Sequence, residues 1–274
     1  MAVIFISYGD ENFKESLIRI KRQAKKLDCF DRIITYHPKD LPLQVKSSPL
    51  MAFRRGGGYW VWKPYIIYKT LMDCQEGDIV VYVDSGCTLR KGAGWKEYFE
   101  LLKTYNALFF QYRSDYDYGW GERFNVNPQD ASPQILHWMK PSCYDYFRQC
   151  FGSDEFKMFN KIWAGFIVVK KTQVISEFIE DWYKITLFHP DLVIDPLNVE
   201  REKMPDSFRA HRHDQPILTC LAHHYQEKGN ILVLPENGES DTKHAVVSAD
   251  RYRVGRLSFM DYLKYKIYQF IHKD

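Results

Sequence analysis

The sequence has no long hydrophobic run, little net charge and no paired-cysteine motif. Its longest stretch without Asp, Glu, Lys or Arg, residues 215–226, is 12 residues long, whereas a membrane-spanning helix needs about 20 apolar residues. The N-terminus lacks a basic region before its apolar residues, which argues against a signal peptide. A net charge of +3 over 274 residues is too small to indicate a nucleic-acid binder. The sequence therefore predicts a globular chain without a spanning segment.

Cysteine is scarce, and its spacing does not indicate metal or redox chemistry. The six cysteines lie in apolar segments without C-x-x-C spacing, at positions 29, 74, 87, 143, 150 and 220. Such residues are usually reduced core cysteines of an intracellular protein, so we expect a cytoplasmic location. No repeat or clear linker divides the chain, and 274 residues suit one large domain.

Short apolar runs alternate with helical patterns along most of the chain. Residues 2–7, 32–36, 78–83, 163–170 and 231–234 are short and largely apolar, as buried strands are. Helical patterns cover residues 13–27, 65–74, 176–187 and 214–225, and Pro64 fits the first turn of its helix. Residues 111–130 and 188–210 are loop-like. This alternation predicts an α/β fold with a mainly parallel central sheet flanked by helices.

A carboxylate follows the most strand-like run of the chain. The run Ile-Val-Val-Tyr-Val ends at Asp84, Ser85 and Gly86. Ligands of open α/β sheets bind at the carboxyl edge of the sheet, where Asp84 is expected. A carboxylate there can hold a divalent cation that neutralises a leaving diphosphate. The plainer alternative is a turn residue that caps the next segment.

A glycine-rich block, residues 54–63, reads Arg-Arg-Gly-Gly-Gly-Tyr-Trp-Val-Trp-Lys. Glycines let a backbone approach a ligand closely, and Arg55 and Lys63 are suitable partners for phosphate. Trp60 and Trp62 offer flat faces to a base or a sugar, and they belong to an aromatic set that makes up 16% of the chain. The alternative is a turn whose tryptophans pack in the core.

The segment Ala-His-Arg-His-Asp-Gln-Pro, residues 210–216, places ionisable groups just before a predicted helix. Asp214 is either the N-cap of that helix or a group that faces an acceptor hydroxyl as a base. His211 and His213 share a face if the segment is extended. With His223 and His224 they leave a zinc site, and hence a metal hydrolase, as an alternative.

Two smaller elements complete the candidates. Ala164 and Gly165, near the start of a predicted strand, let a ligand lie against the backbone, or they serve close packing of a strand and a helix. His244 lies in a polar loop. It either completes a metal or diphosphate site or is a surface residue.

Four stretches together resemble bacterial glycosyltransferases of the GT-A fold, the nucleotide-diphospho-sugar transferases that build surface polysaccharide and lipopolysaccharide. They are Ser7-Tyr8-Gly9, Gly58-Tyr-Trp-Val-Trp-Lys-Pro64, Tyr82-Val-Asp-Ser-Gly-Cys87 and His213-Asp-Gln-Pro216. The resemblance covers residues 1–235. Its most specific feature is the Trp-Val-Trp-Lys-Pro block followed along the chain by Val-Asp-Ser-Gly.

The resemblance implies a Rossmann-like GT-A domain over residues 1–256, with a nucleotide-sugar half at residues 1–110 and an acceptor half at residues 111–256. It implies a hexosyltransferase whose nucleotide-diphosphate donor, a UDP-sugar in the favoured form, binds Ser7, Tyr8, Arg55, Tyr59, Trp60, Lys63, Asp84, Ser85 and Gly86. The acceptor, a hydroxyl of a glycan or a lipid-linked sugar, would bind at Trp163, Ala164, Gly165, His213, Asp214 and Gln215. Catalysis would depend on Asp84 and Asp214.

The Asp-x-Asp motif of the family reads Asp84-Ser85-Gly86 here, so its second carboxylate is absent. The resemblance implies a Mn²⁺ or Mg²⁺ ion on Asp84 with help from His244, and the missing carboxylate weakens such a site. The same gap leaves open a non-catalytic protein of this fold that binds a nucleotide or a carbohydrate.

Residues 257–274 place aromatic and apolar side chains among lysines, which predicts a C-terminal helix. A basic aromatic helix can lie in a membrane interface, which would make the protein peripheral on the inner face of the plasma membrane. The alternative is a last helix that docks on the domain.

Overall fold

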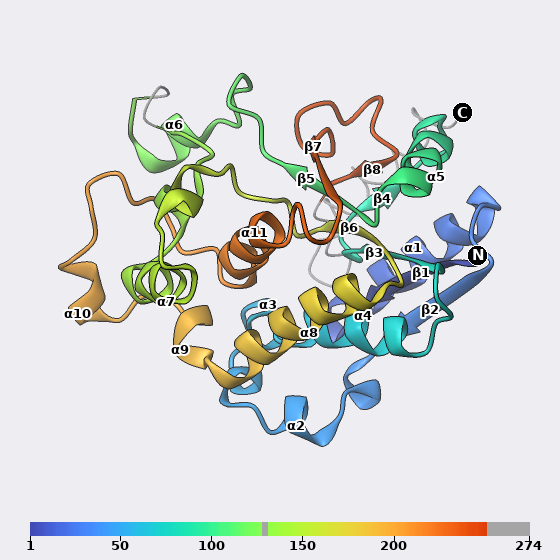
Figure 1. The fold of residues 1–274 in the computed structure, drawn as a ribbon, viewed down its shortest axis with the longest axis horizontal. Coiled ribbons are helices and arrows are strands. Elements are labelled where there is room, and N and C mark those ends of the chain that lie inside the picture. Colours follow the sequence, from blue (N-terminus) through green and yellow to red (C-terminus); the bar gives the residue numbers. More distant parts are fainter. Residues whose placement is uncertain (128–130, 251–274) are drawn as a thin grey trace, which may run out of the picture.

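The centre of the fold is a six-stranded sheet, seen in a computed structural model that describes residues 1–127 and 131–250 (Figure 1). The strand order is β2-β1-β3-β6-β5-β7. The strands are β1 (Val3–Tyr8), β2 (Arg32–Tyr36), β3 (Ile79–Val83), β5 (Ala107–Gln111), β6 (Phe166–Lys170) and β7 (Ile231–Pro235). Three of the five pairings are parallel, and β6 is antiparallel to both its neighbours. The predicted α/β fold with a mainly parallel sheet is confirmed.

The reversal of β6 brings its start to the edge where the other strands end. Val83, the last residue of β3, pairs with Phe166, the first residue of β6. Residues just before β6 therefore lie at the carboxyl edge of the sheet, beside residues that follow β1, β3, β5 and β7. This edge is where the sequence places most of its candidate residues.

Helices cover both faces of the sheet. The long ones are α1 (Lys14–Leu27), α4 (Trp62–Met72), α5 (Gly94–Thr104), α7 (Pro141–Phe151), α8 (Gln173–Phe188) and α11 (Asp214–His224). Tyr98 of α5 packs on Phe110, with ring centroids 5.3 Å apart, whereas Phe178 of α8 packs on Phe109 at 5.5 Å. Because successive strand residues point to opposite faces, α5 and α8 lie on opposite sides. Figure 1 shows α4 beside α8.

Short elements occupy the connections. The short α-helices are α2 (Leu43–Lys46), α3 (Gly56–Tyr59), α6 (Trp120–Phe124), α9 (Pro190–Val193) and α10 (Asn198–Arg201). The 3₁₀ turns are η1 (Glu11–Phe13), η2 (Pro38–Asp40), η3 (Pro49–Ala52), η5 (Ile135–Trp138) and η6 (Glu155–Met158). β4 (Thr88–Leu89) pairs with β8 (Val247–Ser248). The two segments expected to be loops thus contain α6, α9 and α10.

The strand after residue 78 is buried as its sequence predicts. All five residues of β3 are 0% exposed, which fits a continuous apolar run covered on both faces. The strand expected from residue 163 begins only at Phe166. Before it, the Trp163 N–H donates to the Phe110 carbonyl. Residues 162 and 163 thus continue an antiparallel contact with the end of β5, and the Gly165 carbonyl accepts from the Asp84 N–H at the carboxyl edge.

Two predictions concern membranes and cysteines. The C-terminal helix predicted for residues 257–274 lies outside the described residues. Within residues 1–127 and 131–250, no helix has the length and hydrophobicity to span a membrane. All six cysteines are free, and Cys87, Cys143 and Cys220 are buried, whereas Cys150 is exposed. Cys150 is therefore not the core residue that the sequence predicted.

Candidate functional site

Lys63 is a buried lysine at the carboxyl edge of the sheet. It lies in the first turn of α4 and is only 2% exposed. Its Nζ is 3.1 Å from Asp214 Oδ2, 3.5 Å from Asp84 Oδ1 and 3.1 Å from the carbonyl oxygen of Ala164. A buried ammonium requires such partners, because removing a charge from water costs several kcal/mol. One side chain thus joins three stretches that the sequence singled out separately.

Burial and charge act in opposite directions on Lys63. Burial lowers the pKa of Lys63, but the two carboxylates outweigh burial, so that the net pKa is raised. Lys63 is therefore an ammonium at neutral pH. The pKa of Asp214 is raised on balance, since burial and the nearby Asp84 charge raise it and the Lys63 ammonium lowers it. A carboxylate with a raised pKa is better suited to accept a proton.

Asp84 is held at the end of β3 by backbone and side-chain contacts. Its N–H donates to the Gly165 carbonyl at 2.9 Å, and the Tyr82 hydroxyl donates to its Oδ1. The Arg19 guanidinium of α1 donates to the carbonyl oxygens of Ser85 and Cys87 at 3.0 and 2.8 Å. The Asp84 side chain is still 35% exposed. Oδ1 is therefore engaged inside the protein, and among the residues that the structure describes no hydrogen bond or ion pair reaches Oδ2.

The residues around Asp84 fit a divalent cation in one way. Gly86 supplies no second carboxylate, and the described parts of the chain contain no group of three or more His, Cys, Asp or Glu placed to hold a metal. The His244 side chain is 81% exposed, with Nδ1 2.8 Å from Asp241 Oδ1. Mg²⁺ is commonly bound by one or two carboxylates together with substrate phosphates and water. Asp84 fits that arrangement, in which the substrate completes the site.

The glycine-rich block forms a left-handed helical turn. The φ angles are 59° at Gly56, 57° at Gly57, 99° at Gly58, 51° at Tyr59 and 60° at Trp60. The N–H groups of Tyr59 and Trp60 donate to the carbonyls four residues earlier. This hand costs L residues roughly 1–2 kcal/mol each. A Cβ on Gly56 would lie 2.4 Å from the Trp60 ring, so glycine is required for both conformation and space.

The two tryptophans of this block have different surroundings. Trp62 is 6% exposed and stacks on Tyr8 with ring centroids 3.9 Å apart, so it packs in the core, as the plainer interpretation expected. Trp60 is only partly buried. It stacks on His213 at 5.5 Å, and Lys63 Nζ lies 5.9 Å from its ring. The partly exposed Trp60 is the better candidate for contact with a ligand.

His211 and His213 bind the backbone of α9. His211 Nε2 is 2.8 Å from the Leu192 carbonyl oxygen, and His213 Nδ1 is 2.8 Å from the Val193 carbonyl oxygen. Both side chains are buried, and burial lowers the pKa of His213 to about 4. These nitrogens donate to successive carbonyls and are not arranged as metal ligands. The metal-hydrolase alternative therefore loses its basis in this pair.

The N-cap interpretation of Asp214 is wrong. His213 is the N-cap of α11, with φ 60° and ψ −107°, and Asp214 is the first helical residue. A carboxylate in the first turn is stabilised by the helix dipole, and the strained residue before it costs on the order of 1–3 kcal/mol. Gln215 Nε2 donates to the Ile162 carbonyl at 2.5 Å. Gln215 thus fixes the segment that carries Trp163, Ala164 and Gly165.

Two glycines lie against the Trp163 ring, because a larger residue would not fit there. A Cβ on Gly165 would lie 2.6 Å from Trp163 Nε1, and a Cβ on Gly238 would lie 2.4 Å from the far side of the same ring. The ring therefore packs closely against two glycines, and it is 6% exposed. The Ala164 carbonyl accepts a hydrogen bond from Lys63 Nζ, and the Gly165 carbonyl accepts one from the Asp84 N–H. The segment thus serves close packing and positions Lys63 and Asp84; that a ligand lies against its backbone stays a prediction.

The structure brings together only part of the predicted set. Lys63, Asp84, Ala164 and Asp214 meet directly, with Trp60 and His213 beside them. Ser7 Oγ is turned inward and donates to the Val83 carbonyl at 2.7 Å. No contact described for His244 reaches Asp84, so its role as a ligand stays a prediction.

Sequence reasoning missed Asp195, Tyr82 and Arg19. The Arg55 guanidinium lies 2.8 and 3.1 Å from the two carboxylate oxygens of Asp195, and the Tyr59 hydroxyl donates to Oδ2 at 2.7 Å. Asp195 belongs to a segment interpreted as a plain loop, and nothing in its local sequence indicates a partner 140 residues away. Tyr82 stands in the motif Tyr82-Val-Asp-Ser-Gly-Cys87 but was given no role there; its place two residues before Asp84, on the same side of an extended chain, is a signal that could have assigned one.

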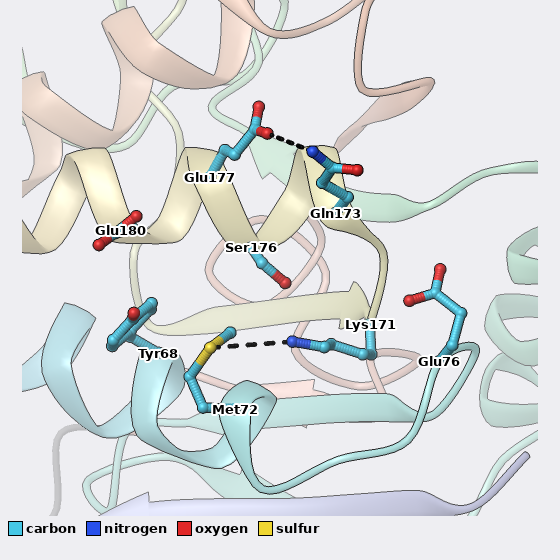
Figure 2. A pocket seen from close by; sticks show the side chains of 8 residues that line it. All are labelled: Tyr68, Met72, Glu76, Lys171, Gln173, Ser176, Glu177 and Glu180. Atoms are coloured by element: carbon cyan, nitrogen blue, oxygen red, sulfur yellow. Dashed lines mark hydrogen bonds between the residues drawn. The ribbon is translucent and has the colours of Figure 1, made fainter.

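A separate hollow lies away from these residues. It lies between α4 and α8 (Figure 2). Its volume is about 330 Å³. Its lining residues are Tyr68, Met72, Glu76, Lys171, Gln173, Ser176, Glu177 and Glu180. None of the predicted site residues lines it. The candidate site is therefore defined by the cluster around Lys63.

Comparisons with known proteins give likenesses of structure. The chain matches no protein-family model and no curated protein sequence. It is similar to the glycosyltransferase involved in glycosylation of the major capsid of PBCV-1, at 9% identity and a TM-score of 0.41, over 86% of this chain and 82% of that one.

Two further solved structures are similar at the same level. Core-mannan synthase A from Aspergillus fumigatus, in a Mn/GDP form, has 11% identity and a TM-score of 0.43, over 85% of this chain and 72% of that one. The galactosyltransferase LgtC, in complex with donor and acceptor sugar analogs, has 14% identity and a TM-score of 0.32, over 80% and 70%. Because these TM-scores are below 0.5, we argue function from the site residues.

Proposed function

We propose that the chain is a glycosyltransferase of the GT-A type, which moves a sugar from a nucleotide-diphosphate donor to a hydroxyl of an acceptor. The observation that carries this proposal is the cluster of Lys63, Asp84 and Asp214 at the carboxyl edge of the sheet. Ligands of open α/β sheets bind at this edge. The cluster offers one exposed carboxylate for the diphosphate side and one buried carboxylate with a raised pKa.

The reaction breaks the bond between the sugar C1 and the diphosphate oxygen, and the diphosphate leaves with the electron pair. A new bond forms between C1 and the acceptor oxygen, whose proton must leave. Asp214 is our candidate for orienting that hydroxyl and taking its proton. Lys63 holds Asp84 and Asp214 in fixed positions. Because its ammonium already contacts Asp84, Asp214 and the Ala164 carbonyl, we assign it this positioning role in place of direct contact with the diphosphate.

The diphosphate carries charge that must be neutralised as it leaves. A Mn²⁺ or Mg²⁺ ion on Asp84 would supply that charge when bound, with the substrate phosphates completing its ligands. The donor side would include Arg55, Tyr59 and Trp60, whose backbone turn lies next to Lys63 in the sequence. The acceptor side would include Trp163 and the segment up to Gly165.

The finer assignments rest on the resemblance of the sequence motifs. We propose residues 1–256 as the GT-A domain, with the nucleotide-sugar half at residues 1–110. We further propose that the donor is a UDP-hexose and that the acceptor belongs to surface polysaccharide or lipopolysaccharide. The protein would lie at the inner face of the plasma membrane.

A thermal-shift screen tests the donor. The full chain is heated with UDP-, GDP-, CMP- and TDP-linked sugars, each with and without Mn²⁺. A ligand that binds the folded state raises the melting temperature by mass action. We expect a selective rise with one diphosphate donor, larger with Mn²⁺. If no donor shifts the melting temperature, the proposal is wrong.

Substitution of Asp84 tests catalysis. We expect Asp84→Ala to abolish sugar transfer from the donor identified by the screen while the protein still folds, with a lower melting temperature because buried Lys63 and Tyr82 each lose a partner. Asp145→Ala, on the exposed surface of α7, is the matched control and should transfer normally. Donor binding without transfer in the unmodified chain would instead favour the non-catalytic binding protein.

A further inference from the structure

Arg55 and Tyr59 form a cradle for an anionic group, and a carboxylate of the same chain fills it. The Arg55 guanidinium lies 2.8 and 3.1 Å from Asp195 Oδ1 and Oδ2, and the Tyr59 hydroxyl is 2.7 Å from Oδ2. His213 Nε2 is 4.0 Å from Oδ1. Both Arg55 contacts come from Nη1, and a guanidinium can bind a phosphate as it binds a carboxylate.

The cradle adjoins the cluster of the proposed active site. The Tyr59 and His213 rings are 4.9 Å apart, and Trp60 stacks on the same imidazole. His213 directly precedes Asp214 in the sequence, and Trp60 faces Lys63. Through His213 and Trp60, the cradle is therefore continuous with the cluster of Lys63, Asp84 and Asp214.

The contact with Asp195 is exposed and therefore exchangeable. The Arg55 and Asp195 side chains are 48% and 41% exposed. Ion pairs of this exposure contribute little to stability, because water can replace either partner. Although burial raises the pKa of Asp195, the Tyr59 hydrogen bond and the Arg55 charge bring it below its usual value. Asp195 is thus an anion at neutral pH, and another anion can replace it at small cost.

Asp195 is presented by a segment that is fixed on both sides of it. We call residues 190–201 the strap; it contains α9 and α10. Its Leu192 and Val193 carbonyls accept from His211 and His213. Its Glu200 pairs with the buried Lys140 at 3.3 Å. Only the middle of the strap, at Asp195, is held by an exposed contact.

We propose that the Arg55–Tyr59 cradle binds a phosphate of the nucleotide-diphosphate donor and that Asp195 of the strap occupies it in the absence of the donor, as an internal competitor. This inference rests on the proposed function. It adds a residue that lowers donor affinity and a segment that moves when the donor binds. Removing the Asp195 charge frees Arg55 and Tyr59 for the phosphate.

Asp195→Asn tests the competition, because it removes the charge and keeps the side-chain shape. The dissociation constants of UDP, GDP and pyrophosphate are measured by calorimetry for the unmodified chain and for Asp195→Asn. We expect the anion that binds to do so about fivefold more tightly in Asp195→Asn, the factor that corresponds to 1 kcal/mol. Asp145→Asn, which loses an exposed pair with Arg148, should bind like the unmodified chain.

Arg55→Gln supplies the second arm. It should weaken binding, and adding Asp195→Asn to it should give no further gain, since the cradle is already lost. If Asp195→Asn tightens the binding of pyrophosphate as much as that of the nucleotides, the cradle binds the phosphate. If it tightens the binding of one nucleotide alone, the phosphate assignment is overturned.

The outcomes separate this inference from the proposed function. Equal or weaker nucleotide binding by Asp195→Asn than by the unmodified chain overturns the competition and leaves the glycosyltransferase proposal standing. Absence of nucleotide and pyrophosphate binding in both chains overturns both. Tighter pyrophosphate binding without any nucleotide binding confirms an anion cradle but overturns its link to the donor.

Discussion

Two ion-pair networks lie close together in this molecule and differ mainly in their exposure. In the inner one, Lys63 pairs with Asp84 and Asp214, and the side chains of Lys63 and Asp214 are 3% and 6% exposed. In the outer one, Arg55 pairs with Asp195, and these side chains are 48% and 41% exposed. The distances are similar, at 3.1 and 2.8 Å. From these distances alone, the two ion pairs would be expected to contribute equally to stability.

Solvent makes them different. Loss of one partner of a buried pair leaves a charge without water and typically costs 3–5 kcal/mol. Loss of one partner of an exposed pair lets water take its place, at 0 to about 1 kcal/mol. The inner network is therefore suited to hold catalytic groups in place, and the outer one to exchange partners. The predictions below test that contrast.

The largest expected effect is that of Lys63→Met. It leaves Asp214 buried without its counter-charge, and we expect the free energy of unfolding to fall by about 3–5 kcal/mol, measured by urea denaturation at pH 7. Lys69→Met is the matched control, since Lys69 lies on the same helix and pairs with Asp73 at 3.1 Å with a 39% exposed side chain. A similar cost for both variants would contradict the contrast.

The second effect concerns pH and His213, which lies between the two networks. Burial lowers the pKa of His213 to about 4, whereas an unfolded histidine titrates near 6.5. Between these values the unfolded chain binds more protons, so stability falls as the pH falls from about 6.5 to 4. The contribution is at most roughly 3 kcal/mol.

His213→Asn measures that contribution. Asn retains a donor and tolerates the positive φ of this position, but it does not titrate. We expect the free energy of unfolding to depend less steeply on pH between 4 and 6.5 than in the unmodified chain. His244→Asn, at an exposed site, should keep the original slope. An unchanged slope in His213→Asn would show that this imidazole is not the buried titrating group.

The smallest effect is on the outer network. We expect Asp195→Asn to change the free energy of unfolding by no more than about 1 kcal/mol, measured by the same urea titration as for Lys63→Met. A loss of 3 kcal/mol or more, roughly that of a buried pair, would mean that the strap is a structural anchor and not an exchangeable contact.

Most strands of the central sheet and several of the helices that cover it were predicted from the sequence, whereas other elements were not. The run at residues 78–83 and the motif at Asp84 were visible because a buried strand needs consecutive apolar residues and ends where the chain turns polar. α5, β5 and α7 were not predicted, although α5 and α7 have an apolar face at helical spacing and β5 is a short apolar run like the strands that were found. The reversal of β6 has no local signal, because pairing direction depends on the whole sheet.

The candidate site shows the same division. Lys63, Asp84 and Asp214 were each found from short motifs, but that one ammonium joins the two carboxylates depends on distant contacts. The inward side chain of Lys63 and the role of Asp195 were not predicted for this reason. His211 and His213 were read as candidate ligands because sequence spacing does not reveal which carbonyls lie opposite.

The left-handed turn at residues 56–60 has a stereochemical consequence. Its backbone is the mirror image of the turn that L-amino acids prefer, so three of its positions would suit D-amino acids, which translation does not supply. Glycine, which is achiral, replaces them. At Gly57, the Cβ of an L residue would lie 3.2 Å from Asp10 Oδ2. The Cβ of a D residue would take the place of the other Hα of Gly57. Tyr59 and Trp60, the two L residues of the turn, therefore adopt the left-handed backbone conformation that L residues disfavour.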